Sequence, residues 1–296
     1  MIDECDKLFE RSLRDQLVTI YSEVSKAKNV RRAMFSATFN NDLEKWFQMN
    51  LDNVVTLIVG GKNVVTENID QHLQFVGSED GKLIALKTLI WNGLEAPVLI
   101  FVHEKEKGRK LFSNLIMDGI NVEVIHSDRI QSQRDKIVSS FREGKILFLI
   151  CTELMGRGID FKAVNTVINY DLPSNPISYI HKIGRVGRAG RKGKAITFFT
   201  ESDLEKLNGI INVMRRSGCE IPEFLQKKVT EISKNRKSDS REKNSKNRKS
   251  DSQKKITKSD SQKRTRHPIT DHKSQTKRKS SKDMNRESFK RKKMIE

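Results

Sequence analysis

The stretch HKIGRVGRAGRKGK, residues 181–194, places glycine at every third position and fills most of the gaps with arginine or lysine. A collagen-like repeat would need many more triplets and abundant proline, and this stretch has neither. Two guanidinium groups that point at one place, here Arg185 and Arg188, are costly unless an anion lies there, and their fork matches phosphate oxygens. The pattern therefore favours a phosphate contact over a solvated basic surface.

A helix through this stretch would bring its functional groups onto one face. If the helix begins near Ser178, His181 lies on the same side as the two arginines, at spacings of four and seven residues. Gly184 and Gly187 would then remove side chains that block a ligand. We expect the glycine spacing to serve access to the phosphate.

Three shorter groups of residues could also do chemistry, although each alone is weak evidence. Asp3-Glu4-Cys5-Asp6 gathers carboxylates, which more often form a solvated acidic surface. Ser36-Ala37-Thr38 is a run of small residues. GRGID, residues 156–160, suits a backbone that approaches a sugar or phosphate, and it suits a plain loop equally well.

The elements that must position these groups follow an alternating pattern from about residue 70 to 200. Five apolar runs read as buried strands: VLIFVH (98–103), VEVIH (122–126), ILFLIC (146–151), TVINYDL (166–172) and AITFFT (195–200). Helical patterns over 106–119 and 131–145 lie between them and stop at glycine. The alternation predicts an α/β fold with a parallel sheet and helices on both faces. Ligands bind beyond the carboxyl ends of such strands, where residues 153–160 and 171–193 fall.

Residues 1–60 follow a different pattern. AMFSATF (33–39) reads as the end of a strand and LEKWFQMNL (43–51) as a helix. Only two apolar residues precede the acidic group, whereas a buried strand needs several, so we expect this segment to be cut at its front. VGGKN (59–63) is the predicted hinge into the alternating region.

Positive charge is concentrated at one end of the 296 residues. The formal net charge is +19, and residues 233–296 hold 24 Lys+Arg against 8 Asp+Glu, a net of +16 that leaves +3 for residues 1–232. With six apolar residues, this tail cannot offset its chain entropy, so we expect disorder. Its twelve-residue repeat carries no apolar stripe, which excludes a solenoid.

The basic tail could be a solubilising extension, an arm that binds nucleic acid through counterion release, or a nuclear-import signal at TKRKSSK (276–282) or FKRKK (289–293). The uneven charge favours the last two. Three scattered cysteines exclude a disulfide framework and a zinc site. No apolar run reaches about 18 residues, and the acidic start is not a signal peptide.

Taken in order, the four groups resemble the motifs of DEAD-box RNA helicases, a branch of superfamily 2. DECD resembles the DEAD box, SAT resembles motif III, GRGID resembles motif V and HKIGRVGR resembles motif VI. Gln131 and Arg134 match the Q-x-x-R element. The resemblance covers residues 1 to about 228, and runs such as RRAMFSATF and GINVEVIH make the chain similar to the branch that acts in small ribosomal subunit assembly. Lys182 and Val186 depart from motif VI, and we expect little effect from either.

The resemblance implies a role for each matching residue. Asp3 and Glu4 would hold Mg²⁺ and orient the attacking water, and Arg185 and Arg188 would stabilise charge on the γ-phosphate of ATP. The remaining roles are nucleotide binding by Gly158 and Asp160, coupling of the two lobes by Ser36, Thr38 and His181, and RNA backbone contacts by Gln131, Arg134 and Thr152.

The sequence lacks one part that the family needs, a P-loop of the form G-x-x-x-x-G-K-[ST]. We therefore expect residues 1–60 to be the end of a first RecA-like lobe, 61–228 a whole second lobe, and 229–296 a disordered basic tail. Two hypotheses remain: a fragment of an RNA-dependent ATPase that is inactive alone, or a complete RNA-binding product without hydrolysis. Expected partners are RNA, for which pre-ribosomal RNA is the favoured candidate, the missing lobe and pre-ribosomal proteins, in the nucleus and its nucleolus.

Overall fold

The computed structural model describes residues 1–8, 11–27, 30–39, 41–51, 53–61, 63–153, 161 and 164–228. By its contacts the chain divides into residues 1–237 and 238–296, and every described residue belongs to the first unit. The expected three-part division, with boundaries after residues 60 and 228, stays a prediction. Gly158, Asp160 and the basic tail lie outside the described residues.

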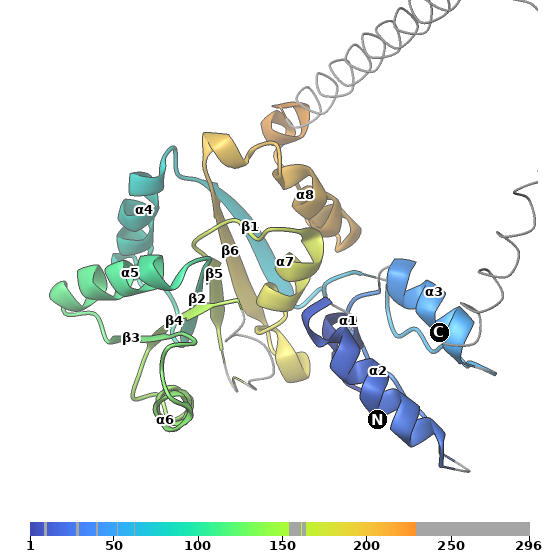
Figure 1. Ribbon diagram of the computed structural model, residues 1–296. Coiled ribbons are helices and arrows are strands. Elements are labelled where there is room, and N and C mark those ends of the chain that lie inside the picture. Colours follow the sequence, from blue (N-terminus) through green and yellow to red (C-terminus); the bar gives the residue numbers. More distant parts are fainter. Residues whose placement is uncertain are drawn as a thin grey trace, which may run out of the picture. The chain divides into compact units, whose positions relative to one another are not determined.

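Within the described residues, six parallel strands form one sheet in the order β1-β6-β5-β2-β4-β3 (Figure 1). The strands are β1 (Ile69–Phe75), β2 (Val98–Val102), β3 (Val122–Ile125), β4 (Phe148–Thr152), β5 (Thr166–Asn169) and β6 (Gly193–Phe199). All five pairings are parallel. The predicted α/β fold with a parallel sheet is confirmed, and five of the six strands coincide with the apolar runs.

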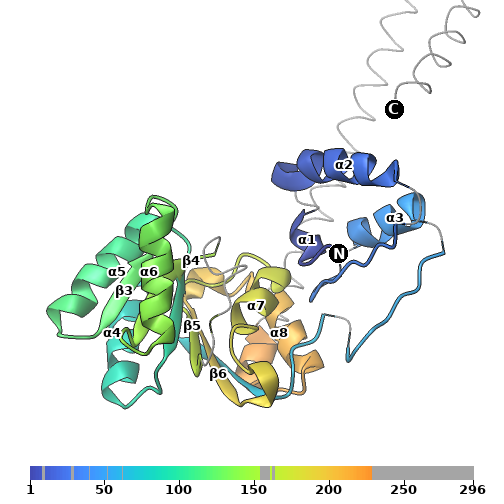
Figure 2. The same ribbon diagram turned by 90° about the horizontal axis from the view of Figure 1, so that it is seen from below.

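Helices cover both faces of the sheet because successive strand residues point in opposite directions. In β2, Leu99 and Phe101 pack with the helices α6 (Gln131–Arg142), α7 (Pro176–Ile183) and α8 (Leu207–Arg216). Val98, Ile100 and Val102 pack with α4 (Glu79–Trp91) and α5 (Lys105–Met117) on the other face. Figures 1 and 2 both show α7 and α8 side by side. Burial of each such side chain stabilises the fold by about 1.5–3 kcal/mol relative to its exposure.

The described part of residues 1–61 contains three helices and one short bridge. The helices are α1 (Cys5–Leu8), α2 (Arg11–Ser25) and α3 (Asn41–Asn50), and the last of these was predicted. Ile2 pairs with Met34 in a parallel bridge, which is what remains of the expected strand end. No helix within the described residues is long and apolar enough to cross a membrane.

Helix α7 is shorter than the sequence pattern predicts. Asn175 caps its start by accepting a hydrogen bond from the Ser178 amide at 2.8 Å, and Pro176 occupies the first turn. The helix ends at Ile183, with Gly184 as its C-cap, so the prediction that Arg185 and Arg188 lie on it is wrong. Both arginines follow the helix in a tight, irregular turn.

Candidate functional site

Asp6, at the start of α1, joins the SAT segment to helix α7. Its carboxylate accepts hydrogen bonds from the Ser36 hydroxyl at 2.9 Å and from the Thr38 hydroxyl at 2.8 Å. His181 Nε2 lies 3.1 Å from the Asp6 carboxylate and 3.1 Å from Thr38 Oγ1. The structure therefore brings together the three predicted coupling residues, Ser36, Thr38 and His181, around a carboxylate that had no assigned role.

Hydrogen bonding fixes the protonation of this network. The Thr38 hydroxyl donates its hydrogen to Asp6, so only oxygen lone pairs face the His181 ring. The Nε2 atom of His181 must therefore carry a hydrogen, which it donates to Thr38 Oγ1 and the Asp6 carboxylate. Burial alone would raise the pKa of Asp6, but the hydrogen bonds from His181, Thr38 and Ser36 together with the charge of the imidazole lower it to about 2. Asp6 is thus a permanent anion at neutral pH.

Arg185 reaches the acidic group, and Arg188 is held separately. Arg185 is 9% exposed; its Nε donates to the His181 carbonyl at 3.2 Å, and its Nη2 lies 3.9 Å from Glu4 Oε1. Arg188 is exposed, and its Nε donates to the Gly184 carbonyl at 3.0 Å. One predicted guanidinium therefore faces the predicted carboxylate pair, where a phosphate would have to enter between them.

Asp3, which is exposed, and Glu4, which is half-buried, form an acidic corner with an unusual backbone. Glu4 has φ of +47°, a left-handed conformation that is uncommon for residues other than glycine, and the Asp3 carboxylate accepts the Glu4 amide at 2.8 Å. Within the described residues no cluster of three or more His, Cys, Asp or Glu side chains could hold a metal ion. Two carboxylates fit Mg²⁺, which keeps several waters and takes further ligands from substrate phosphates.

The glycines of the opening stretch serve the backbone more than they serve a ligand. Gly187 has φ of +70°, and a Cβ there would lie 2.6 Å from the Ile69 side chain of β1. A Cβ on Gly193 would lie 2.6 Å from the Val186 side chain. The expectation that these positions leave room for a phosphate is wrong at Gly187, because the space beside it is filled by the edge strand.

The three predicted RNA contacts lie at or beyond the carboxyl ends of two neighbouring strands. Gln131 and Arg134 lie in the first turn of α6, which follows β3, and Thr152 ends β4. Gln131 is exposed and donates to Asp135 at 2.7 Å, whereas Arg134 is half-buried. The structure thus places polar groups suited to a nucleic-acid backbone along one edge.

Two buried ionic groups at the same edge had no role assigned to them from the sequence. Asp171, just past β5, accepts Lys82 at 2.9 Å, Lys107 at 2.7 Å and the His103 amide at 2.9 Å. Lys182 on α7 is 2% exposed and lies 3.7 Å from the Glu153 carboxylate. A charged residue directly after an apolar strand run, as in INYD and ICTE, is the sequence signal that could have identified Asp171 and Glu153.

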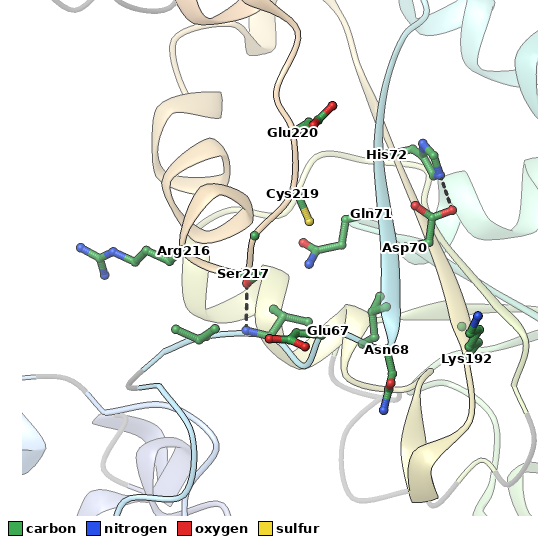
Figure 3. A pocket seen from close by; sticks show the side chains of 15 residues that line it. Glu67, Asn68, Asp70, Gln71, His72, Lys192, Arg216, Ser217, Cys219 and Glu220 are labelled. Carbon is green, nitrogen blue, oxygen red and sulfur yellow. Dashed lines mark hydrogen bonds and ion pairs between the residues drawn. The ribbon is translucent and has the colours of Figure 1, made fainter.

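A pocket of about 910 Å³ lies away from these groups, between β1 and the segment that follows α8. Gln71 and Cys219 project into it, and the Ser217 hydroxyl accepts the Val65 amide at 3.0 Å on its wall (Figure 3). None of the described residues that the sequence analysis assigned to the site lines this pocket. It is therefore distinct from the predicted phosphate and RNA edge.

Comparison with known proteins places this geometry in context. Residues 81–190 match the helicase conserved C-terminal domain. The chain is 50% identical over 240 residues to the probable ATP-dependent RNA helicase DDX52 of Bos taurus, covering 80% of this chain and 40% of the relative. It is 42% identical over 239 residues to the ATP-dependent RNA helicase ROK1 of Saccharomyces cerevisiae, covering 80% of this chain and 42% of that one.

A solved structure gives the same result for the fold. S. cerevisiae Dbp5 bound to RNA and ADP BeF3 matches with a TM-score of 0.66 at 30% identity, over 78% of this chain and 62% of that chain. The chain spans about 40% of the length of the curated relatives named above. The motifs and the similarity along the whole matched region indicate the same family.

Proposed function

The chain belongs to the DEAD-box family of ATP-dependent RNA helicases, with a RecA-like second lobe, and from this we propose that it supplies half of an RNA-stimulated ATPase that opens short RNA duplexes. The observation that carries the proposal is the Asp6–Thr38–His181 network, which ties the segment with the acidic corner to the helix that leads into the two arginines.

On the nucleotide side, each residue has a task set by its position. Arg185 and Arg188 would neutralise charge on the terminal phosphate, because guanidinium groups bind phosphate oxygens in a fixed geometry. The Glu4 carboxylate, 3.9 Å from Arg185, would orient a water molecule. Bound Mg²⁺ would offset phosphate charge, with Asp3 and Glu4 holding it through water. Gly158 and Asp160 would contact the nucleotide.

On the RNA side, Gln131, Arg134 and Thr152 would contact phosphates and sugars. Such contacts position a strand without reading its sequence. The net charge of +16 over residues 233–296 supports a further electrostatic contribution to RNA affinity. We extend the proposal to ribosomal RNA processing and small-subunit assembly in the nucleolus, supported by the resemblance of the motifs and by this basic tail.

Phosphate release tests the proposal. The 296-residue chain alone should hydrolyse ATP negligibly, because the sequence contains no P-loop to hold the β- and γ-phosphates. A fusion in which the part of the Bos taurus relative that lies upstream of its match to residue 1 precedes this chain should show RNA-stimulated release of at least tenfold. Arg185→Lys in the fusion should reduce the rate by about 10²-fold or more, since a lysine cannot reproduce the forked contact.

Two results would contradict the proposal. A fusion that binds RNA but never hydrolyses ATP would favour a non-catalytic RNA-binding module. RNA-stimulated hydrolysis by the 296-residue chain alone would show that phosphate binding does not depend on a P-loop. An Arg191→Lys fusion is the matched control, since Arg191 is exposed and follows the same turn without a predicted phosphate contact.

A further inference from the structure

Helix α7 contacts three different parts of the molecule through three side chains. Residues 178–183 are all buried, so the helix is surrounded on every side. Tyr179 donates to Gln71 on the edge strand β1 at 2.8 Å, and His181 contacts Asp6 and Thr38. Lys182 is rotated about 100° from His181 and points to the carboxyl end of the sheet instead.

Lys182 is an unusual choice for the place it occupies. It is 2% exposed, its ammonium lies 5.6 Å from the centre of the Phe101 ring, and within the described residues that ammonium makes no hydrogen bond. Burial lowers the pKa of Lys182, and the charge of Glu153 opposes that effect. A buried ammonium costs several kcal/mol unless it is paired well, so stability alone does not explain it.

Glu153 is the partner that the geometry offers. It follows Thr152 directly at the end of β4, it is 28% exposed, and its carboxylate lies 3.7 Å from Lys182 Nζ. That separation is longer than a charge-assisted hydrogen bond, which spans ~2.8 Å. The two side chains are therefore near each other without a direct hydrogen bond, and this is the open form of the pair. Lys182 also stands three residues before Arg185, whose guanidinium lies 3.9 Å from Glu4.

We propose that Lys182 is a positioning residue that transmits RNA occupancy at Thr152, through Glu153, to His181 and Arg185. RNA bound at the end of β4 closes the Glu153–Lys182 pair, and the closed pair fixes the orientation of α7 and of the arginine turn behind it. A ligand can shift α7 between two arrangements only if it binds one of them more tightly than the other. Here the two arrangements differ in whether the Glu153–Lys182 pair is open or closed. This inference rests on the proposed RNA binding, and it revises the expectation that Lys182 matters little.

The test follows His181, one residue from Lys182, in the full 296-residue chain. Ring signals of the six histidines are recorded by NMR on histidine-labelled protein, and His181→Gln assigns the relevant one. The probe is a fluorescein-labelled 15-nucleotide oligo(U), whose affinity is measured by anisotropy. In the wild type, saturating RNA should shift the His181 signal.

Variants separate transmission from folding and from RNA contact. Lys182→Met should bind oligo(U) within about twofold of the wild type, since the ammonium is buried, but should lose the His181 response. Lys182→Arg should keep the response, because the longer fork reaches the carboxylate. Lys110→Met removes the same charge from an exposed position on α5 and should behave as the wild type.

The remaining outcomes decide the inference in distinct ways. A full His181 response in Lys182→Met overturns it, as does a wild type that binds oligo(U) with His181 unmoved. A wild type that binds no oligo(U) fails earlier and contradicts the proposed function itself. If Lys182→Met does not fold, Glu153→Gln, altered at a partly exposed carboxylate, decides: a retained response there overturns the inference, and a lost response supports it.

Discussion

The Asp6 carboxylate joins distant segments of the chain through its hydrogen bonds. Three side chains from two distant segments, Ser36, Thr38 and His181, converge on its two oxygens, and the residue is buried. The motif resemblance assigned work to Asp3 and Glu4, yet the last carboxylate of the same group is the one that joins α1 to α7. The reason is geometric, because α1 begins at Cys5 and turns Asp6 inward.

Replacing Asp6 with asparagine should weaken this junction. The amide keeps one acceptor, but it loses the charge that attracts the His181 imidazole, so we expect a loss of about 1–3 kcal/mol in the free energy of unfolding. Urea unfolding followed by circular dichroism measures it. Asp15→Asn, at an exposed position on α2, is the control and should change stability by less than about 0.5 kcal/mol.

Acid should protonate two buried carboxylates, Asp6 and Asp171, over the same range of pH and so destabilise the fold. The pKa of Asp6 and the pKa of Asp171 are both lowered to about 2, in each case by hydrogen bonds and charges that outweigh burial. A lowered pKa adds stability that is complete above the ordinary value near 4 and disappears as pH falls towards 2. Each residue should account for about 2 kcal/mol of that loss.

Unfolding free energies at pH 6 and pH 2.5 check this expectation. Asp171→Asn should lose less between these two values than the wild type does, because its titrating group is gone. An equal loss in the two proteins would mean that other carboxylates cause the acid sensitivity.

At the scale of elements, Asp171 connects strand β5 to helices α4 and α5. Lys82 of α4 is 3% exposed in its side chain, and Lys107 of α5 donates to the same Asp171 oxygen. Burial would lower the pKa of Lys107, but its two carboxylate partners, Asp171 and Glu79, raise it. These contacts set the distance between the two helices at the carboxyl edge.

Asp171→Asn should therefore lower the free energy of unfolding much more than the removal of an exposed charge does. It leaves the buried Lys82 ammonium with only the exposed Glu79 carboxylate as its partner, and loss of the buried partner costs up to about 3–5 kcal/mol. Adding Lys82→Met should recover a large part of that loss, because no charge then remains buried. Thermal melts of both single variants and the double variant give the coupling energy, with Asp80→Asn on the exposed side of α4 as control. Additive single effects would show that the pair does not interact.

Most elements could be read from the sequence because they are buried on both faces. Strand β2 is apolar at every position, and its limits were predicted to within one residue. Strand β1 was missed because Asp70, His72 and Gln74 interrupt its apolar residues, as expected for an edge strand with one solvated side. Helix α7 was extended too far because residue spacing cannot show that the helix already ends at Ile183, before the left-handed Gly187.

The site was predictable to the extent that it consists of local motifs. Ser36, Thr38 and His181 do meet, but what they meet on, Asp6, follows from the turn of α1 and not from any spacing. The burial of Lys182 and Asp171 depends on packing between distant elements, which a short motif does not contain. Short motifs therefore predicted residues for ligand contact, which stays a prediction, but they did not show which residues hold those side chains in place.

At the scale of the whole molecule, charge separates the chain into two parts with different physical roles. Residues 1–232 carry a net charge of +3, so the RNA binding that we propose for them would depend on a few placed contacts at the sheet edge. Residues 233–296 carry +16, which binds a polyanion mainly by releasing its counterions. The two contributions differ in how they respond to salt.

Removing residues 233–296 should weaken RNA binding at low salt and flatten its salt dependence. Each phosphate contact that is lost reduces the slope of log affinity against log salt by about 0.7 for a single strand, so a loss of several contacts is easily measured. Anisotropy with labelled oligo(U) between about 50 and 200 mM salt gives both quantities, a range over which several such contacts change affinity by orders of magnitude. A chain with the tail lysines and arginines replaced by glutamine keeps the length and should behave like the deletion. If both altered chains retain the wild-type slope, the tail does not bind RNA, and its charge serves import or solubility instead.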